Sequence, residues 1–274
     1  MKEEVKTKSI FYGMEFTHGL RRALMNGLGL VYFLSLGFEL KAVTTLFAIT
    51  VLVSLFFEFP TGAIADYDSR KKSVMICFFL MAVGSLGIFI FNNFWLLSFS
   101  WMLGNIAWTF YSGAGSAWSI DALNYGKKKS KIVSLISKSY FFENGGQVIG
   151  GLIGMLVIAL NFRFIWLVIS LSNLIMFLIL AKYMKEVNFK PEKAEHNYII
   201  KAFIKAKESF EYIIHKKNRQ LRVLLLGSTL GTLTFSAFYV GMPLLFTEIL
   251  KINPEQAAFG KRRRPGLEER QRRI

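Results

Sequence analysis

One apolar stretch near the amino terminus carries four polar side chains on a single helical face. Their spacing of i, i+3, i+7 and i+11 places Glu15, His18, Arg22 and Asn26 in one row over three turns. Such a row could bind a polar small molecule or carry a proton if it lines a cavity. The alternative is that Glu15, His18 and Arg22 lie at a membrane interface and extend to lipid headgroups. Asn26 favours the cavity, because it lies too deep in the stretch to reach an interface.

A second polar row lies in the apolar stretch 94–118. Its members are Asn105, Thr109, Ser112 and Ser116. Small residues and hydroxyl groups also let membrane helices pack closely, so packing explains Ser112 and Ser116 as well as binding does. We expect Asn105, together with Thr109, to contribute to a substrate cavity.

Three acidic residues are candidates for proton coupling. Glu143 lies one to two turns into an expected helix over 139–160, where partial burial would favour the neutral form that proton transfer requires. The alternative is a fixed ion pair of Glu143 with Lys138 or with an arginine of the first helix. Asp121 and Glu58 lie near the ends of expected helices, where they could form gate contacts or face headgroups.

The sequence lacks the common motifs of hydrolytic and metal-dependent enzymes. Cys77 is the single cysteine, so neither a disulfide nor a cysteine-ligated metal site can form within one chain. No His-Glu-x-x-His or Gly-x-Ser-x-Gly motif occurs, and the three histidines are widely dispersed. We therefore expect no enzyme, no metal and no cofactor other than a coupling proton or cation.

The elements that must position these residues are membrane-spanning helices. The chain of 274 residues has 53% hydrophobic content, 27 phenylalanines and a mean hydropathy of +0.39, which is more apolar surface than a soluble domain of this length buries. A span needs about 20 mostly apolar residues. Seven stretches qualify: 17–38, 42–62, 73–91, 94–118, 139–160, 163–183 and 222–247. The expected fold class is an all-α membrane protein.

Basic residues concentrate in alternate connections between these stretches. The formal net charge is +16, and Lys and Arg gather around residues 70–72, 127–131 and 182–219. The intervening connections carry only Lys41 and Arg163. Because cytoplasmic loops are enriched in Lys and Arg, we expect a multi-pass protein of the plasma or inner membrane with a cytoplasmic amino terminus. The charge then indicates orientation rather than binding of nucleic acid.

The connection after the second stretch has a distinctive spacing of glycine, acid and basic residues. The pattern resembles the Gly-x-x-x-Asp-x-x-x-Arg-Lys-(Arg or Lys) signature of the major facilitator superfamily. In those transporters the signature joins the second and third membrane helices. The matching residues here are Gly62, Asp66, Arg70, Lys71 and Lys72. The resemblance implies a loop in which Asp66 caps the third helix or pairs with Arg70. It also implies that this loop helps to latch the two halves of a transporter.

A glycine-rich segment in the fifth expected helix adds to this resemblance. Residues 145–151 read Gly-Gly-Gln-Val-Ile-Gly-Gly, similar to the Gly-Pro-x-x-Gly-Gly motif of drug-exporting antiporters in the same superfamily. Gln147 stands where that motif has proline. We expect Gly146, Gly150 and Gly151 to allow close packing against another helix.

The resemblance implies the first half of a twelve-helix transporter. Residues 1–183 would form an N-terminal six-helix bundle, 184–220 a central cytoplasmic loop with an amphipathic helix, and 221–259 the first helix of an incomplete C-terminal bundle. Residues 260–274 are rich in arginine and unlike the preceding sequence, and we interpret the chain as truncated. The alternative for this tail is a role in binding nucleic acid or anionic lipid.

Two functions are consistent with these features. The first is a secondary transporter that works by alternating access and exports small amphipathic molecules. The second is a non-transporting membrane fragment or interaction module, because one bundle and a single helix do not supply both walls of a transport cavity. The expected partners are a small-molecule substrate, the lipid bilayer, and the missing C-terminal bundle or a second copy of the chain; nucleic acid is not expected.

Overall fold

A computed structural model of the chain describes residues 2–26, 28–188, 204, 207, 211–213, 215 and 218–244. These residues form helices and connecting segments, with no strand among them, so the predicted all-α fold is confirmed. Most of the predicted amphipathic helix of the central loop, and the whole of the predicted tail, lie outside the described residues.

The helices follow the apolar stretches of the sequence. They are α1 (Lys2–Asn26), α2 (Gly29–Ser35), α3 (Leu40–Tyr67), α4 (Arg70–Ile90), α5 (Phe94–Thr109), α6 (Ala114–Ala122), α7 (Lys129–Leu160), α8 (Phe164–Tyr183) and α10 (Arg219–Leu244). Two predicted spans are wrong as continuous helices. The stretch 17–38 is divided between α1 and α2, and the stretch 94–118 is divided between α5 and α6.

The interruption between α5 and α6 contains a glycine with a left-handed backbone. Gly113 has φ of 77°, a conformation that residues with a side chain rarely adopt. The N–H of Ser112 still donates to the carbonyl oxygen of Trp108 at 3.1 Å, so the last turn of α5 stays hydrogen-bonded. Apolar content alone predicted one helix here, because a single turn residue hardly changes the mean hydropathy of a long stretch.

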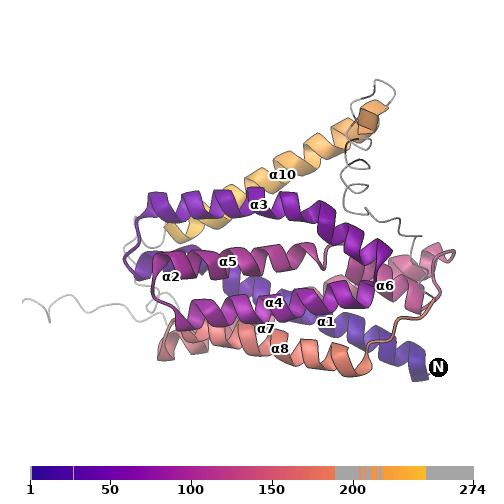
Figure 1. The fold of residues 1–274 in the computed structure, drawn as a ribbon, viewed down its shortest axis with the longest axis horizontal. Coiled ribbons are helices and arrows are strands. Elements are labelled where there is room, and N and C mark those ends of the chain that lie inside the picture. Colours follow the sequence, from indigo (N-terminus) through magenta and orange to yellow (C-terminus); the bar gives the residue numbers. More distant parts are fainter. Residues whose placement is uncertain are drawn as a thin grey trace, which may run out of the picture.

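The helices pack as a bundle with aligned long axes. Figure 1 shows α3, α5, α4 and α8 side by side, and α4 contacts both α5 and α8 extensively. The most extensive packing joins α1 to α7, and α10 contacts α2. Ser170 of α8 donates from Oγ to the carbonyl oxygen of Ala82 of α4 at 2.8 Å. Such hydrogen bonds between helices stabilise packing where no hydrophobic driving force acts between them.

The outer surface of the bundle is apolar. Large side chains exposed on it include Val51, Phe56, Phe99, Leu152 and Ile175. In water such a surface would drive association, whereas in a bilayer it faces lipid tails. By length and composition, four of the described helices can each cross a membrane: α3, α4, α7 and α8. The fold is that of a multi-pass membrane protein.

The two ends of the bundle differ in charge. One end, here called the basic end, gathers the start of α1, the α3–α4 and α6–α7 connections and the end of α8 (Figure 1). The lysines and arginines there include Lys6, Lys8, Arg70, Lys71, Lys72, Lys127, Lys128, Lys129, Lys131, Lys182 and Lys185. At the opposite end, Arg163 donates from Nη2 to the carbonyl oxygens of Ile90 at 2.9 Å and Phe91 at 3.0 Å. The bundle thus places the predicted basic connections at 70–72 and 127–131 together, along with Lys182 and Lys185 from the start of the third.

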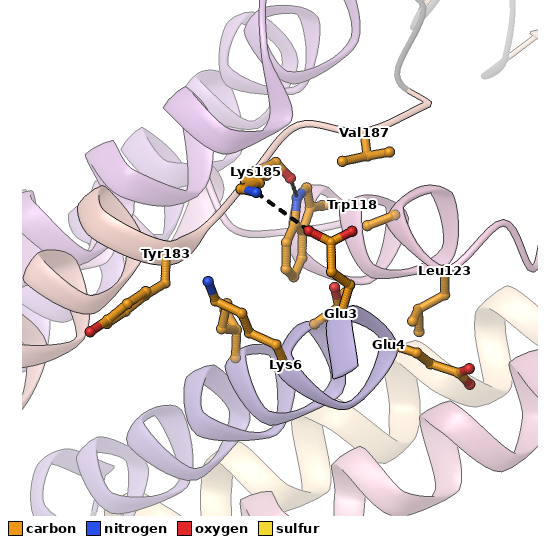
Figure 2. Close-up of a pocket in the computed structure, with 11 residues that line it drawn as sticks. Glu3, Glu4, Lys6, Trp118, Leu123, Tyr183, Lys185 and Val187 are labelled. Atoms are coloured by element: carbon orange, nitrogen blue, oxygen red, sulfur yellow. Dashed lines mark hydrogen bonds and ion pairs between the residues drawn. The ribbon is translucent and has the colours of Figure 1, made fainter. Parts of the chain in front are cut away.

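The polar first turns of α1 form an ion pair and hydrogen bonds with other parts of the basic end. Figure 2 shows Glu3 facing Lys185, with 3.4 Å between Oε1 and Nζ. Glu4 accepts hydrogen bonds from Nζ of Lys8 at 2.7 Å and from the hydroxyl of Tyr125 at 2.6 Å. These two donors, Lys8 foremost, lower the pKa of Glu4 to about 2. The start of α1 is therefore part of the folded bundle.

Candidate functional site

A cavity of about 400 Å³ lies between α1, the α5–α6 turn and α7. Its volume falls in the range of about 300–1,000 Å³ that is typical of small-molecule sites. The polar part of its lining comes from Glu15, Arg22, Tyr111, Ser112, Ser116, Ser139, Tyr140 and Glu143. Phe11, Trp108 and Ile136 add an apolar part. A lining of this kind suits a molecule with both polar and apolar groups.

An ion pair between α1 and α7 forms one wall of the cavity. Nη1 of Arg22 lies 2.5 Å from Oε1 of Glu143. The side chain of Glu143 is 11% exposed and that of Arg22 is 40% exposed, so the carboxylate is the buried partner. The sequence left open whether Glu143 pairs with Lys138 or with an arginine of the first helix, and the structure shows the arginine.

The second acid of the cavity has a different kind of partner. The hydroxyl of Tyr111 donates to Oε1 of Glu15 at 2.8 Å. Within the part of the chain that the structure describes, Glu15 forms no ion pair. Sequence reasoning placed Glu15 on the right helical face but did not identify Tyr111, because that contact joins residues 96 positions apart.

Three of the other residues predicted for the cavity, His18, Asn105 and Thr109, are not part of its lining. His18 is 2% exposed and is enclosed by three aromatic rings, and neither ring nitrogen has a hydrogen-bond partner in the described structure. Asn105 and Thr109 each donate to a carbonyl oxygen of their own helix at 2.8 Å. The side chain of Asn26 lies outside the described structure. A role in substrate binding stays a prediction for all four.

Of the three acids predicted for proton coupling, one lines the cavity. It is Glu143, which is buried there. Asp121 lies at the basic end, where it pairs with Arg70, and Glu58 is exposed on α3. Burial beside a cavity therefore favours Glu143 among them.

Glycines let α1 and α7 approach to backbone contact. A methyl group at Gly146 would overlap a carbonyl oxygen of α1, and one at Gly150 would lie 2.8 Å from another. Sequence analysis did not single out Gly19 of α1. A methyl group at this position would likewise overlap the carbonyl oxygen of Glu143. The packing role predicted for Gly151 is wrong, since no atom lies within 4 Å of where its Cβ would be. One residue beyond Gly150, it points about 100° away from the shared face.

The signature residues lie where α3 ends and α4 begins. α3 includes both Gly62 and Asp66, so they are helical and not part of a loop. Asp66 is exposed and forms no ion pair with any other described residue. Arg70 pairs instead with Asp121 of α6. The predicted pairing of Asp66 with Arg70 is therefore wrong, because the fold brings a nearer carboxylate from another helix.

The start of α4 is capped by Ser69 and by a residue from beyond α8. Oγ of Ser69 accepts from the N–H of Lys72 at 3.0 Å and donates to Oε2 of Glu186 at 2.7 Å. Oε1 of Glu186 accepts from the N–H groups of Arg70 at 2.8 Å and Lys71 at 3.4 Å. A carboxylate at a helix N-terminus is stabilised by the unpaired N–H groups and the helix dipole. The cap predicted for Asp66 is thus supplied by Ser69 and Glu186.

Replacing Glu186 by alanine is expected to destabilise the bundle by about 1 kcal/mol, the usual cost of losing an N-cap acceptor. Amide hydrogen exchange at residues 70 and 71 should become faster, because both N–H groups lose their acceptor. Thermal unfolding in detergent and exchange mass spectrometry measure the two effects. Glu58→Ala, an exposed change on α3, is the control. Equal unfolding temperatures and equal exchange rates in the two variants would contradict the capping role.

Comparison with known proteins identifies the family. A family model for the Major Facilitator Superfamily matches residues 12–260. A search of curated protein sequences found no match. Among solved structures, the chain resembles one described as the crystal structure of a POT family transporter in complex with thioalcohol conjugated peptide. The TM-score is 0.58 at 18% identity, and the match covers 89% of this chain and 51% of that one. The chain thus spans about half the length of that transporter, and the likeness concerns the fold. Because the family model covers most of the sequence, the chain belongs to the Major Facilitator Superfamily, a superfamily of membrane transporters.

Proposed function

We propose that the chain contributes one bundle to a secondary transporter that works by alternating access. The observation that carries this proposal is the cavity, where Glu15, Arg22 and Glu143 meet inside an apolar bundle. A charged side chain at membrane depth costs about 2.5–3.5 kcal/mol on insertion scales, so three of them around one space indicate a functional requirement. The cavity is this bundle's share of the substrate site, with Glu143 as the group for proton coupling.

Small amphipathic compounds are the proposed substrates, and export is the proposed direction. Aromatic side chains such as Trp108 and Tyr140 line the same cavity as the charged groups, so the cavity offers contacts to both parts of such a molecule. The resemblance of residues 145–151 to the motif of drug-exporting antiporters supports the direction.

Dye transport in proteoliposomes tests the proposal. The full 274-residue chain is reconstituted and efflux of a panel of amphipathic dyes is followed by fluorescence. Ser112→Trp, which fills the cavity, should reduce efflux at least tenfold. Leu152→Trp, on the outer surface of α7, should leave it unchanged. If the wild-type chain moves no dye, the alternative of a non-transporting membrane fragment or interaction module is favoured.

The proposed location is the plasma or inner membrane, with the amino terminus in the cytoplasm. This orientation follows from the positive charge of the basic end. Cys77 is buried and is the only cysteine, so introduced cysteines can be labelled selectively. In intact cells an impermeant maleimide should label Asn93→Cys at the opposite end and not Lys71→Cys. The reverse pattern would overturn the orientation.

The junction of α3 and α4 is proposed as a conformational latch between this bundle and a partner bundle. Its residues are Gly62, Asp66, Arg70, Lys71 and Lys72. Asp66 is exposed at the basic end, where a second bundle could contact it. Asp66→Asn is expected to slow transport several-fold while the amount of inserted protein stays unchanged. Normal transport rates in this variant would count against the latch.

A further inference from the structure

We infer that one anionic phospholipid binds at the basic end, between the start of α1 and the end of α8. Its phosphate lies between Lys6 and Lys182, and its acyl chains run along α8. This site goes beyond the proposed transport function, and its residues do not line the cavity between α1 and α7. Three observations carry the inference: two lysines without an acidic partner, an aromatic ring that both approach, and an apolar stripe on the same face of α8.

The acidic groups around this site each have a partner of their own. Glu3 pairs with Lys185 at 3.4 Å, Glu4 pairs with Lys8 at 2.7 Å, and Glu186 accepts from the start of α4. By contrast, Lys6 and Lys182 are exposed and form no ion pair with any other described residue. These two lysines therefore leave a local surplus of positive charge that an anion can neutralise.

Both lysines approach the ring of Tyr183, the last residue of α8. Nζ of Lys6 lies 4.7 Å from the ring centroid, and Nζ of Lys182 lies 5.2 Å from it. Figure 2 shows Lys6 of α1 extending toward Tyr183. The two ammonium groups are thus no more than about 10 Å apart, which is one Debye length at about 0.1 M salt. An anion between them is attracted by both charges at once.

The level of the site in the membrane favours a lipid headgroup. α8 is one of the described helices that can cross a membrane, and Lys182 and Tyr183 are its last two residues. Tyrosine is enriched where membrane helices reach the headgroups, and lysine side chains there extend their charged ends out of the apolar layer. A lipid phosphate is therefore the anion that this level of the membrane supplies.

An apolar stripe of α8 continues from the two residues toward the middle of the membrane. Its side chains stand four and eight positions before Lys182 and Tyr183, and so on the same helical face. They are Leu174, Ile175, Leu178 and Ile179. All four are exposed, with exposed fractions between 36% and 58%. A soluble phosphate would leave this stripe unused, whereas the acyl chains of a phospholipid cover it.

The two lysines should prefer an anionic lipid to a zwitterionic one. The headgroup of phosphatidylcholine carries a quaternary ammonium that cancels the charge of its own phosphate, whereas phosphatidylglycerol has a net negative charge. Basic residues beside a membrane are attracted by that net charge. The lysines therefore select by headgroup, while the apolar stripe accepts the chains of either lipid.

Native mass spectrometry of the full 274-residue chain in detergent tests the inference. Phosphatidylglycerol and phosphatidylcholine with identical oleoyl chains are titrated separately. One phosphatidylglycerol should bind saturably, at least fivefold more tightly than phosphatidylcholine. The double variant Lys6→Gln/Lys182→Gln should weaken phosphatidylglycerol binding at least tenfold, because each lysine near the surface contributes about a factor of five. Phosphatidylcholine binding should stay unchanged in this variant.

The matched control is Lys127→Gln/Lys128→Gln, which removes two exposed lysines from the α6–α7 connection at the same end. Its affinity for phosphatidylglycerol should stay within twofold of wild type. Equal losses in the two double variants would show a general attraction of the basic end and overturn the site. Glycerol 3-phosphate in large excess should not displace the lipid, and displacement would overturn the lipid as the ligand. Absence of saturable phosphatidylglycerol binding would overturn the inference as a whole.

Discussion

Replacing Gly146 by alanine is expected to destabilise the bundle by about 1–3 kcal/mol, the usual cost of overpacking. Alanine is the better helix former by about 0.5–1 kcal/mol, so helix propensity alone predicts the opposite sign. Packing decides, because the added methyl group would overlap the backbone carbonyl of Phe16. A backbone atom in a helix cannot rotate away as a side chain can. Thermal unfolding in detergent and the yield of monodisperse protein measure the effect.

Gly151→Ala is the matched control for this prediction. Gly151 lies in the same helix and the same glycine-rich segment, and nothing lies within 4 Å of the position that its Cβ would take. Alanine there should stabilise the protein slightly through helix propensity. The two variants are thus expected to shift the unfolding temperature in opposite directions. Shifts of the same sign and size would show that the contact between α1 and α7 is not as close as the structure has it.

The glycine contact also shows how much of the packing the sequence could predict. The spacing of Gly146 and Gly150 by four residues places both on one face of a helix, and this part of the prediction is confirmed. The error at Gly151 arose from treating a motif as a unit, although adjacent helical residues point about 100° apart. Gly19 was missed because no second glycine lies three or four residues from it in α1, and only the crossing of the two helices reveals its contact.

The fold class and the distribution of charge were predictable for a different reason. Apolar stretches and basic connections are local properties of the chain, and each reports directly on burial in lipid or on exposure at an interface. The break at Gly113 was not predictable in this way, since apolar residues continue on both sides of it.

The capping and pairing at the basic end depended on distant parts of the chain. Glu186 binds the start of α4 across more than 110 positions, and Asp121 reaches Arg70 across 51. No spacing in the sequence relates these residues. The resemblance implied that Asp66 caps the third helix or pairs with Arg70. The structure gives these two roles to Glu186 and Asp121 instead, because folding brings segments that are distant in sequence to the start of α4.

The pair of Arg22 and Glu143 is expected to respond unequally to removal of its two charges. Arg22→Gln leaves the carboxylate of Glu143, 11% exposed, without a partner, and should destabilise the bundle by about 3 kcal/mol. Glu143→Gln leaves an arginine side chain that is 40% exposed and can reach water, so about 1 kcal/mol is expected. The double variant should be more stable than Arg22→Gln alone. Unfolding temperatures of the three variants measure this asymmetry.

The exposed pair of Asp68 and Lys72 is the control for that asymmetry. Nζ of Lys72 lies 2.9 Å from Oδ1 of Asp68, with both side chains about half exposed or more. Since water solvates either charge after the other is removed, each single change should cost at most about 1 kcal/mol. Asymmetry at this pair as large as that at the cavity would contradict burial of Glu143 as its cause.

The same variants distinguish a structural ion pair from a proton carrier. If Glu143 releases and binds the coupled proton, Glu143→Gln should abolish the pH dependence of transport as well as reduce its rate by at least tenfold. A purely structural pair predicts a lower rate with the pH profile unchanged, because glutamine removes the ion pair with Arg22 but no group that must take up a proton during transport. Transport in proteoliposomes at a series of external pH values separates the two, and an unchanged profile would remove Glu143 from the coupling role while leaving the cavity itself intact.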